Sequence, residues 1–136
     1  MLLVTPNYGV CLRIFHPCIN PEYITTCLGL IPVRFWISGK QRSTPKGTLL
    51  EGLNKETYWC HTFDPPDNIG LNDSLVIVFA KLSPHKYLFE LIYSDGGHAE
   101  IYLPIRSGEN AGDTIKFSTL ESFANLKINF SLELFP

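Results

Sequence analysis

Glu90, His98 and Glu100 are the residues of this sequence whose types and spacing suit acid–base chemistry. Two carboxylates beside an imidazole can donate and accept the protons that a hydrolase or transferase must move. Residues 95–97 (Asp-Gly-Gly), in the middle of the segment 87–106, are typical of a hairpin turn. A three-residue loop there would place Glu90 and Glu100 on neighbouring strands and on one face. A small acid–base enzyme is therefore one hypothesis.

Histidines and cysteines are the residues that could bind a metal, and the candidates are His16, Cys18, Cys60, His61, His85 and His98. His16 and Cys18 are two residues apart, but Pro17 lies between them and no second pair has ligand spacing. Cys60 and His61 are adjacent, so on a strand their side chains point to opposite faces. We therefore expect no metal site.

The sequence lacks the local signatures of nucleophilic and nucleotide-dependent enzymes. It has no G-x-S-x-G elbow, and no cysteine lies in a recognised catalytic motif. Residues 108–112 contain two glycines without a following Lys-Ser or Lys-Thr, which indicates a connecting loop and not a phosphate-binding loop. We expect no cofactor and favour a non-enzymatic protein, while a Cys-His pair assembled in space stays open as an alternative.

Composition and charge narrow the class of protein. The chain has 136 residues, of which 45% are apolar and 18% charged, as in one globular domain with a core. The net charge is −2 and the Lys and Arg residues are scattered, so the basic footprint of nucleic-acid binding is missing. No stretch approaches the roughly 18–20 apolar residues that span a bilayer. We therefore expect neither nucleic acid nor a membrane as partner.

The N-terminus and the cysteines indicate the compartment. Residues 1–7 lack a basic region and a long apolar run, and so do not resemble a signal peptide. Cys11, Cys18, Cys27 and Cys60 include no CxxC pair and lack the dense spacing of a secreted disulfide scaffold. We expect a cytoplasmic protein with reduced, mostly buried thiols.

Hydrophobic period and turn residues predict the secondary structure. Alternation predicts strands over residues 8–16, 33–37, 57–63, 87–94, 98–106 and 128–134. Helices are predicted over residues 21–28, with Asn20 as N-cap and Gly29 as the stop, over about 72–82, and from a capping box at 118–121 to about 125. Residues 38–54 indicate a surface loop.

These elements predict a single α+β domain over residues 1–136. A largely antiparallel sheet with short helices on one face is the simplest architecture for them. The first six elements have the ferredoxin-like order β-α-β-β-α-β, and an extra β-α-β follows. The sequence leaves the order of the strands within the sheet open.

Alternation also assigns side chains to the two faces of the predicted sheet. Val33, Phe35 and Ile37 are expected to enter the core, whereas Arg34 and Trp36 point away from it. In the predicted hairpin, the residues expected to face the helices are Tyr87, Phe89, Leu91, Ala99, Ile101 and Leu103. The opposite face would carry Arg13, Arg34, Trp36, Glu90, Ile92, His98, Glu100, Tyr102, Arg106 and Glu133.

This opposite face mixes aromatic rings with charges of both signs, which is typical of recognition surfaces. Our leading hypothesis is a non-enzymatic binding or interaction module with another protein as its partner. The residues proposed to bind are Arg34, Trp36, Glu90, His98, Glu100 and Tyr102. The alternatives are a solvated face with routine ion pairs, or a homodimer that buries the tryptophans between subunits.

Residues 24–39 (ITTCLGLIPVRFWISG) resemble the opening motif I-T-x-x-L-G-x-x-P-x-x-x-W-x-x-G of a bacterial family, the domain of unknown function 4279 family. The Tyr58-Trp59 strand and the glycine-containing loop before the last helix match more loosely, so the resemblance covers roughly residues 10–135. It implies a bacterial α+β domain and no known activity, so no site residue is carried over. The motif also has a structural explanation, because Gly29 suits a helix end and Gly39 a turn.

Overall fold

The computed structural model describes residues 8–106 and 112–136. The predictions for residues 1–7 and for most of the loop at 108–112 therefore lie outside the described residues. The elements follow in this order: β1 (Val10–His16), α1 (Pro21–Leu28), β2 (Arg34–Trp36), β3 (Gln41–Ser43), β4 (Leu49–Leu53), β5 (Thr57–Phe63), α2 (Leu71–Leu82), a 3-10 turn (Ser83–His85), α3 (Lys86–Ser94), β6 (His98–Arg106), α4 (Phe117–Asn125) and β7 (Ile128–Phe135). No helix in the described segments is long and apolar enough to cross a membrane.

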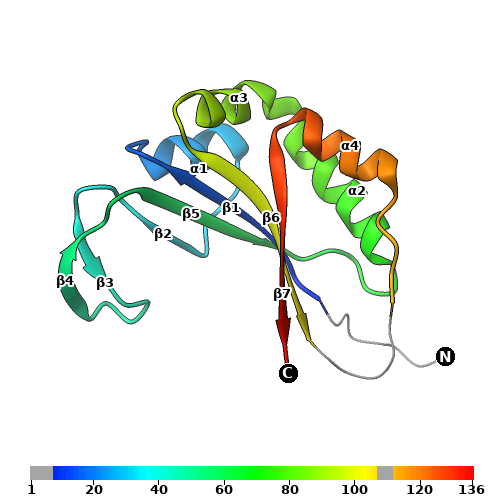
Figure 1. Cartoon of the computed structure of the whole chain (residues 1–136), viewed down its shortest axis with the longest axis horizontal. Coiled ribbons are helices and arrows are strands. Elements are labelled where there is room, and N and C mark those ends of the chain that lie inside the picture. The colour runs from blue at the N-terminus through cyan, green and yellow to red at the C-terminus, as the bar shows by residue number, and fades with distance from the viewer. Residues whose placement is uncertain (1–7, 107–111) are drawn as a thin grey trace.

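The main sheet has the strand order β2-β5-β1-β6-β7. Its first four strands pair antiparallel, and β7 runs parallel to β6. The first four strands form two interleaved units, because β5 lies between β1 and β2, and β1 lies between β5 and β6. The predicted α+β class with ferredoxin-like element order and helices on one face is confirmed (Figure 1). The extra unit runs from β6 through α4 to β7.

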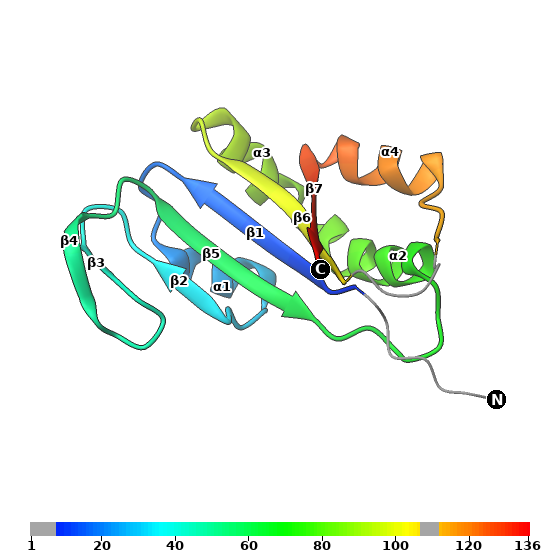
Figure 2. The same ribbon diagram turned by 60° about the horizontal axis from the view of Figure 1, so that its bottom comes forward.

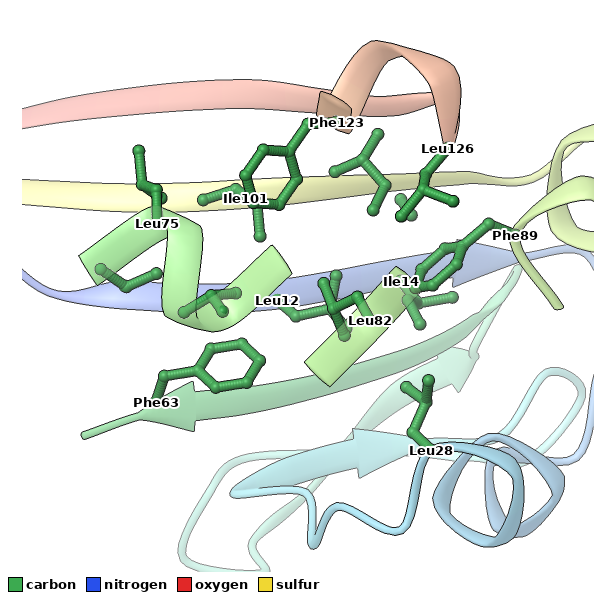
Figure 3. Close-up of a cluster of buried hydrophobic side chains, with 14 of the residues drawn as sticks. Leu12, Ile14, Leu28, Phe63, Leu75, Leu82, Phe89, Ile101, Phe123 and Leu126 are labelled. Carbon is green, nitrogen blue, oxygen red and sulfur yellow. The ribbon is translucent and has the colours of Figure 1, made fainter. Parts of the chain in front are cut away.

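The helices cover one face of this sheet, and the hydrophobic core lies between the two layers (Figure 1). Alternate strand residues such as Leu12, Ile14 and Ile101 are fully buried in it. Figure 3 shows them beneath side chains of the helices, among them Leu75, Leu82, Phe89 and Phe123. Burying one such side chain stabilises the fold by roughly 1.5–3 kcal/mol, so this face of the sheet carries most of the packing energy.

Helix α1 begins and ends where the sequence predicts. Asn20 Oδ1 accepts a hydrogen bond from the Glu22 N–H at 2.9 Å, and Gly29 takes the left-handed conformation at φ +66°. Trp59, fully buried on β5, donates from Nε1 to Thr25 Oγ1 of α1 at 3.0 Å. The first half of the 24–39 motif therefore ends a helix and fixes it against the sheet.

The predicted hairpin over residues 87–106 is wrong, because its first half forms α3. Phe89 and Ile92, which are three residues apart, are buried on one side of this helix. Tyr87 and Leu91, expected to face the helix layer from a strand, are instead 85% and 40% exposed. The segment is apolar at both strand and helix spacing, so periodicity alone does not distinguish the two.

The glycines at residues 96 and 97 end α3 and do not form a hairpin turn. Gly96 takes the left-handed conformation at φ +90°. The Gly97 N–H donates to the Ile92 carbonyl at 2.8 Å. A Cβ on Gly97 would lie 2.3 Å from the Phe15 carbonyl oxygen, so this glycine allows the corner before β6 to approach the backbone of β1.

The loop predicted at residues 38–54 contains a two-stranded sheet, β3–β4. The Thr44 N–H donates to the Thr48 carbonyl at 2.8 Å, and Gly47 turns the chain at φ +89°. Both strands are short and mostly exposed. β3 is polar, and the three leucines of β4 do not alternate with polar residues, so neither strand has the apolar alternation that predicts a strand. The hairpin extends away from the helix layer on the β2 side of the main sheet (Figure 1).

The capping box predicted at residues 118–121 is also wrong. Helix α4 begins two residues earlier, with Lys116 in place of Ser118 as the N-cap, and the Lys116 side chain makes no capping bond. The Lys116 N–H donates to Asn72 Oδ1 of α2 at 2.9 Å, and Asp113 Oδ2 accepts from the first N–H of α2 at 2.8 Å. The two helix N-termini are therefore satisfied by tertiary contacts, which a local pattern does not indicate.

The burial predicted for residues 33–37 is wrong because β2 is an edge strand. Val33 and Phe35 are 65% and 53% exposed. The Phe35 side chain lies on the helix side, where it lines a groove of about 410 Å³ together with Pro21 and Thr25 of α1. Helix α1 covers this edge only in part, so the side chains have the predicted orientation but do not reach the core.

Candidate functional site

The face of the main sheet opposite the helices is called the open face here. Arg13 lies opposite Cys60 on β5 and Glu100 on β6, so these three side chains share this face. Alternation along the paired strands adds further members: Cys11, Phe15, Arg34, Trp36, Tyr58, Thr62, His98, Tyr102, Ser131 and Glu133. Figure 2 brings the open face forward, and the strands β1, β5 and β6 lie there without a described helix in front of them.

Four aromatic side chains from neighbouring strands form a row across the open face: Trp36, Tyr58, Phe15 and His98. The Trp36 and Tyr58 rings stack with centroids 4.4 Å apart, and Phe15 lies 5.1 Å from Tyr58 and 4.6 Å from His98. All four remain partly or largely exposed. Desolvation raises the pKa of the Tyr58 phenol, so this ring stays uncharged at neutral pH. This aromatic row is an apolar strip on an otherwise polar surface.

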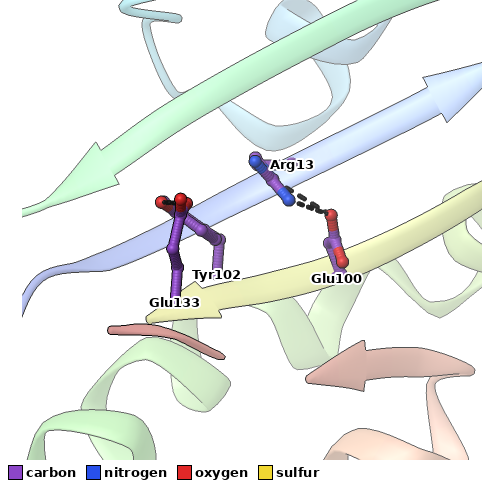
Figure 4. Close-up of polar contacts among 4 residues, drawn as sticks. All are labelled: Arg13, Glu100, Tyr102 and Glu133. Atoms are coloured by element: carbon purple, nitrogen blue, oxygen red, sulfur yellow. Dashed lines mark hydrogen bonds and ion pairs between the residues drawn. The ribbon is translucent and has the colours of Figure 1, made fainter. Parts of the chain in front are cut away.

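Charged side chains beside the aromatic row are held by one another (Figure 4). Arg13 donates from Nε and Nη2 to Glu100 Oε1 at 3.0 and 2.6 Å, and its guanidinium lies 4.0 Å from the centroid of the Tyr102 ring. Burial lowers the pKa of Arg13, but the hydrogen bond to Glu100 and the charge interactions with Glu100, Tyr58 and Tyr102 together outweigh it, so the pKa rises overall. The Tyr102 hydroxyl donates to Glu133, which raises the pKa of Tyr102. Both carboxylates are therefore engaged within the face.

Arg34 and Trp36 connect the open face to the β3–β4 hairpin. The Arg34 guanidinium lies 5.2 Å from the Trp36 ring centroid and donates to the Ser43 carbonyl of β3 at 3.2 Å. Two cavities of about 350 and 280 Å³ are lined by Trp36 and by Arg42 of the hairpin. Within residues 8–106 and 112–136, Arg34 forms no ion pair. Its charge is therefore available to a ligand.

Five of the six residues proposed to bind share the open face: Arg34, Trp36, His98, Glu100 and Tyr102. Glu90 does not, because it lies on α3, where its carboxylate is 3.8 Å from Lys86 Nζ. The sheet separates it from Glu100, so the predicted carboxylate pair is wrong. Ile92, also expected on this face, is buried in the core.

His16, a metal candidate in the sequence, has a structural role. Its Nδ1 accepts hydrogen bonds from the N–H groups of Cys18 and Ile19 at 3.0 and 2.8 Å. Nε2 therefore carries the proton and donates to Asp95 Oδ2 at 2.9 Å. This buried ring ties the end of β1 to the next loop and to the end of α3. In the part of the chain that the structure describes, no three His, Cys, Asp or Glu residues cluster as a metal site.

Phe15 and Tyr58, two members of the aromatic row, were not predicted from the sequence. The available signal was alternation, because Phe15 is two residues from Arg13 on one strand and Tyr58 is two residues from Cys60 on another. Alternation assigns a face but not a neighbouring strand. The row depends on the strand order β2-β5-β1-β6, because this order places one aromatic residue from each of the four strands side by side.

Comparison with known proteins supports the resemblance of the 24–39 motif. A family model described as "Domain of unknown function (DUF4279)" matches residues 6–135, nearly the whole chain. No curated protein and no solved structure matches the chain. The matched range includes every strand of the open face as well as the motif. The chain therefore belongs to the DUF4279 family of domains of unknown function.

Proposed function

We propose that this protein is a non-enzymatic binding module that docks another protein on its open face. The observation that carries this proposal is the aromatic row, whose four rings stay partly exposed although polar side chains at these positions would cost the core nothing. Trp, Tyr and Arg are the residue types that dominate binding energy at protein interfaces. Trp36, Tyr58 and Arg34 lie together at one end of the row.

Charge favours a partner that presents an acidic residue beside apolar side chains. Arg13 is neutralised by Glu100, and Glu133 accepts a hydrogen bond from Tyr102. Arg34 retains a free charge next to Trp36. A carboxylate of the partner placed over Arg34, with an apolar side chain on the Trp36–Tyr58 stack, would complement both groups.

The acid–base hypothesis loses its main support. Glu90 lies on the other side of the sheet, Glu100 is bonded to Arg13, and His98 stacks on Phe15. A bacterial cytoplasmic setting is part of the proposal. The four free cysteines support the cytoplasm, and the resemblance of the 24–39 motif supports a bacterial source.

A double variant, Trp36→Ala with Tyr102→Ala, tests the docking face. Wild type and variant are used to capture proteins from the native host, and captured proteins are then purified and titrated against each by calorimetry. We expect the double variant to lose a partner that the wild type binds, with a fall in affinity of about tenfold or more. Arg34→Glu should weaken the same complex, because it reverses the charge that faces the partner.

The matched control is Tyr87→Ala with Phe117→Ala, which removes two aromatic residues that are 85% and 81% exposed outside the open face. This control should keep every partner. If the folded Trp36/Tyr102 variant also keeps them all, the open face is not the docking site. If light scattering shows a wild-type dimer that the Trp36/Tyr102 variant alone converts to a monomer, the face joins two copies and the proposal of a different partner is wrong.

A further inference from the structure

Two thiols lie side by side on the open face, and the proposed docking does not use them. Cys11 is opposite Thr62, and Cys60 is opposite Arg13, so the two cysteines are diagonal neighbours on the adjacent strands β1 and β5. Both side chains belong to the face that the helices leave uncovered. No disulfide joins them, and each is a free thiol. Neither belongs to the hydrophobic layer beneath the helices.

The surroundings of Cys11 suit a thiolate. Cys11 Sγ lies 3.5 Å from Thr62 Oγ1, so the hydroxyl can donate a hydrogen bond to the sulfur. Arg13, two residues along β1 on the same face, adds only a small contribution, because its charge is already paired with Glu100. Cys11 itself is 9% exposed, but Thr62 is exposed. Cys11 therefore lies beside an exposed side chain at the surface of the open face.

Cys11 and Cys60 shift each other's pKa in opposite directions. Hydrogen bonding from the Cys60 thiol is the largest cause that lowers the pKa of Cys11, burial opposes it, and Thr62 and Arg13 lower it further, so that the pKa falls overall from 9.0 to about 6. The same interaction raises the pKa of Cys60. Near neutral pH, Cys11 is therefore the thiolate and Cys60 the donor. The other titratable or charged groups that face the pair are Arg13 on β1, Tyr58 on β5, Glu100 and Tyr102 on β6, and Glu133 on β7.

We propose that Cys11 is a modification site, at which hydroperoxides oxidise the thiolate while Cys60 and Thr62 hold it in place. The sulfur attacks the terminal oxygen of the hydroperoxide, an S–O bond forms and the O–O bond breaks. The alkoxide or hydroxide that leaves takes a proton from water. Sulfur is oxidised by two electrons to a sulfenic acid, and the hydroperoxide is reduced. Condensation with the Cys60 thiol would release water and leave a disulfide.

Cys18 provides an internal comparison, because it is exposed whereas Cys11 is nearly buried. If exposure alone set reactivity, Cys18 would react first with any oxidant. If stabilisation of the thiolate dominates, Cys11 reacts first near pH 6, where its thiolate is already populated. The two explanations therefore predict opposite orders of reaction within one protein.

The experiment treats the reduced full chain with one equivalent of hydrogen peroxide near pH 6, traps sulfenic acids with dimedone and reads each cysteine by peptide mass spectrometry. We expect dimedone on Cys11, or a Cys11–Cys60 disulfide where the Cys60 thiol reaches the Cys11 sulfenic acid first; in Cys60→Ser, which cannot form this disulfide, dimedone on Cys11 identifies the attacking sulfur. Alkylation by iodoacetamide at the same pH gives the rate without oxidation. Cys60→Ala should slow alkylation of Cys11 by about tenfold or more, because it removes the donor.

Cys60→Ser is the matched variant, since its hydroxyl can still donate to the Cys11 sulfur, and it should keep most of the wild-type rate. If Cys60→Ala does not fold, Thr62→Val tests the same thiolate by removing the second donor, and slower alkylation is again expected. Faster oxidation of Cys18 than of Cys11, or an unchanged Cys11 rate in the folded donor variants, would overturn the proposal. These measurements use the protein alone, so their outcome is independent of any docking partner.

Discussion

The covered and open faces belong to the same five strands but differ in what their side chains touch. On the covered face, Leu12, Ile14 and Trp59 are fully buried beneath helices. On the open face, Arg13 and Phe15 alternate with Leu12 and Ile14 along β1, and they contact side chains of the sheet itself, such as Glu100 on β6 and Tyr58 on β5. One face is determined by the packing of two layers, and the other by contacts within one layer.

This difference separates the side chains that stabilise the fold from those that the proposed docking would use. A side chain beneath the helices loses all contact with water, and its removal leaves a cavity. A ring of the aromatic row already keeps part of its surface in water, so its removal takes away less burial energy. Residues of the open face are therefore less constrained by folding, and aromatic residues retained there are available for binding.

The largest expected effect is that of Phe123→Ala in the core. Phe123 is fully buried and packs edge-on against Phe79 and Phe130, with centroids 5.4 and 5.2 Å away. We expect a loss of about 3–5 kcal/mol in the free energy of unfolding. Phe15→Ala on the open face should cost only about 1 kcal/mol, because it loses two exposed ring contacts. Urea unfolding followed by tryptophan fluorescence measures both, and equal losses would contradict the division between the faces.

Gly97→Ala is expected to have the next largest effect, and it tests the close approach of the backbones of β6 and β1. The new Cβ would lie 2.3 Å from the Phe15 carbonyl oxygen, so β6 and β1 must move apart at a cost of about 2–3 kcal/mol. Gly96→Ala is the control, because a Cβ there meets nothing within 4 Å and only the positive φ causes strain, about 1 kcal/mol. Urea midpoints of the two variants decide this, and a Gly97 variant no less stable than the Gly96 variant would show that the strands yield freely.

Alternation and capping residues correctly predicted the strands and the helix whose formation depends on residues near one another in the chain. The strands β1, β5, β6 and β7 follow from alternation, and α1 follows from Asn20 and Gly29, whose own conformations start and stop the helix. Five of the six proposed binding residues lie on the open face because alternation fixes the face of a residue whatever its neighbours are.

The errors occurred where tertiary contacts choose between local alternatives. Residues 86–94 suit a strand or a helix, and burial of Phe89 and Ile92 against the sheet selects the helix. That choice removed Glu90 from the open face. The aromatic row and the proximity of Cys11 to Cys60 depend on which strands are adjacent in the sheet. The alternation of residues along one strand does not indicate which distant strand will pair with it.

The smallest expected effect is the coupling between Arg13 and Glu100, and it asks whether polar contacts give the open face any stability of its own. Both side chains are partly buried, 25% and 13% exposed, and Arg13 donates two hydrogen bonds to one carboxylate oxygen. A double-mutant cycle with Arg13→Met and Glu100→Gln should give a coupling of about 1 kcal/mol that falls as salt is added. Urea unfolding of the four proteins measures it. A coupling indistinguishable from zero would mean that this pair adds nothing to stability, which would widen the contrast with the covered face. A coupling as large as the loss in Phe123→Ala would remove that contrast, because polar contacts in one layer would then stabilise the fold as strongly as packing between two layers.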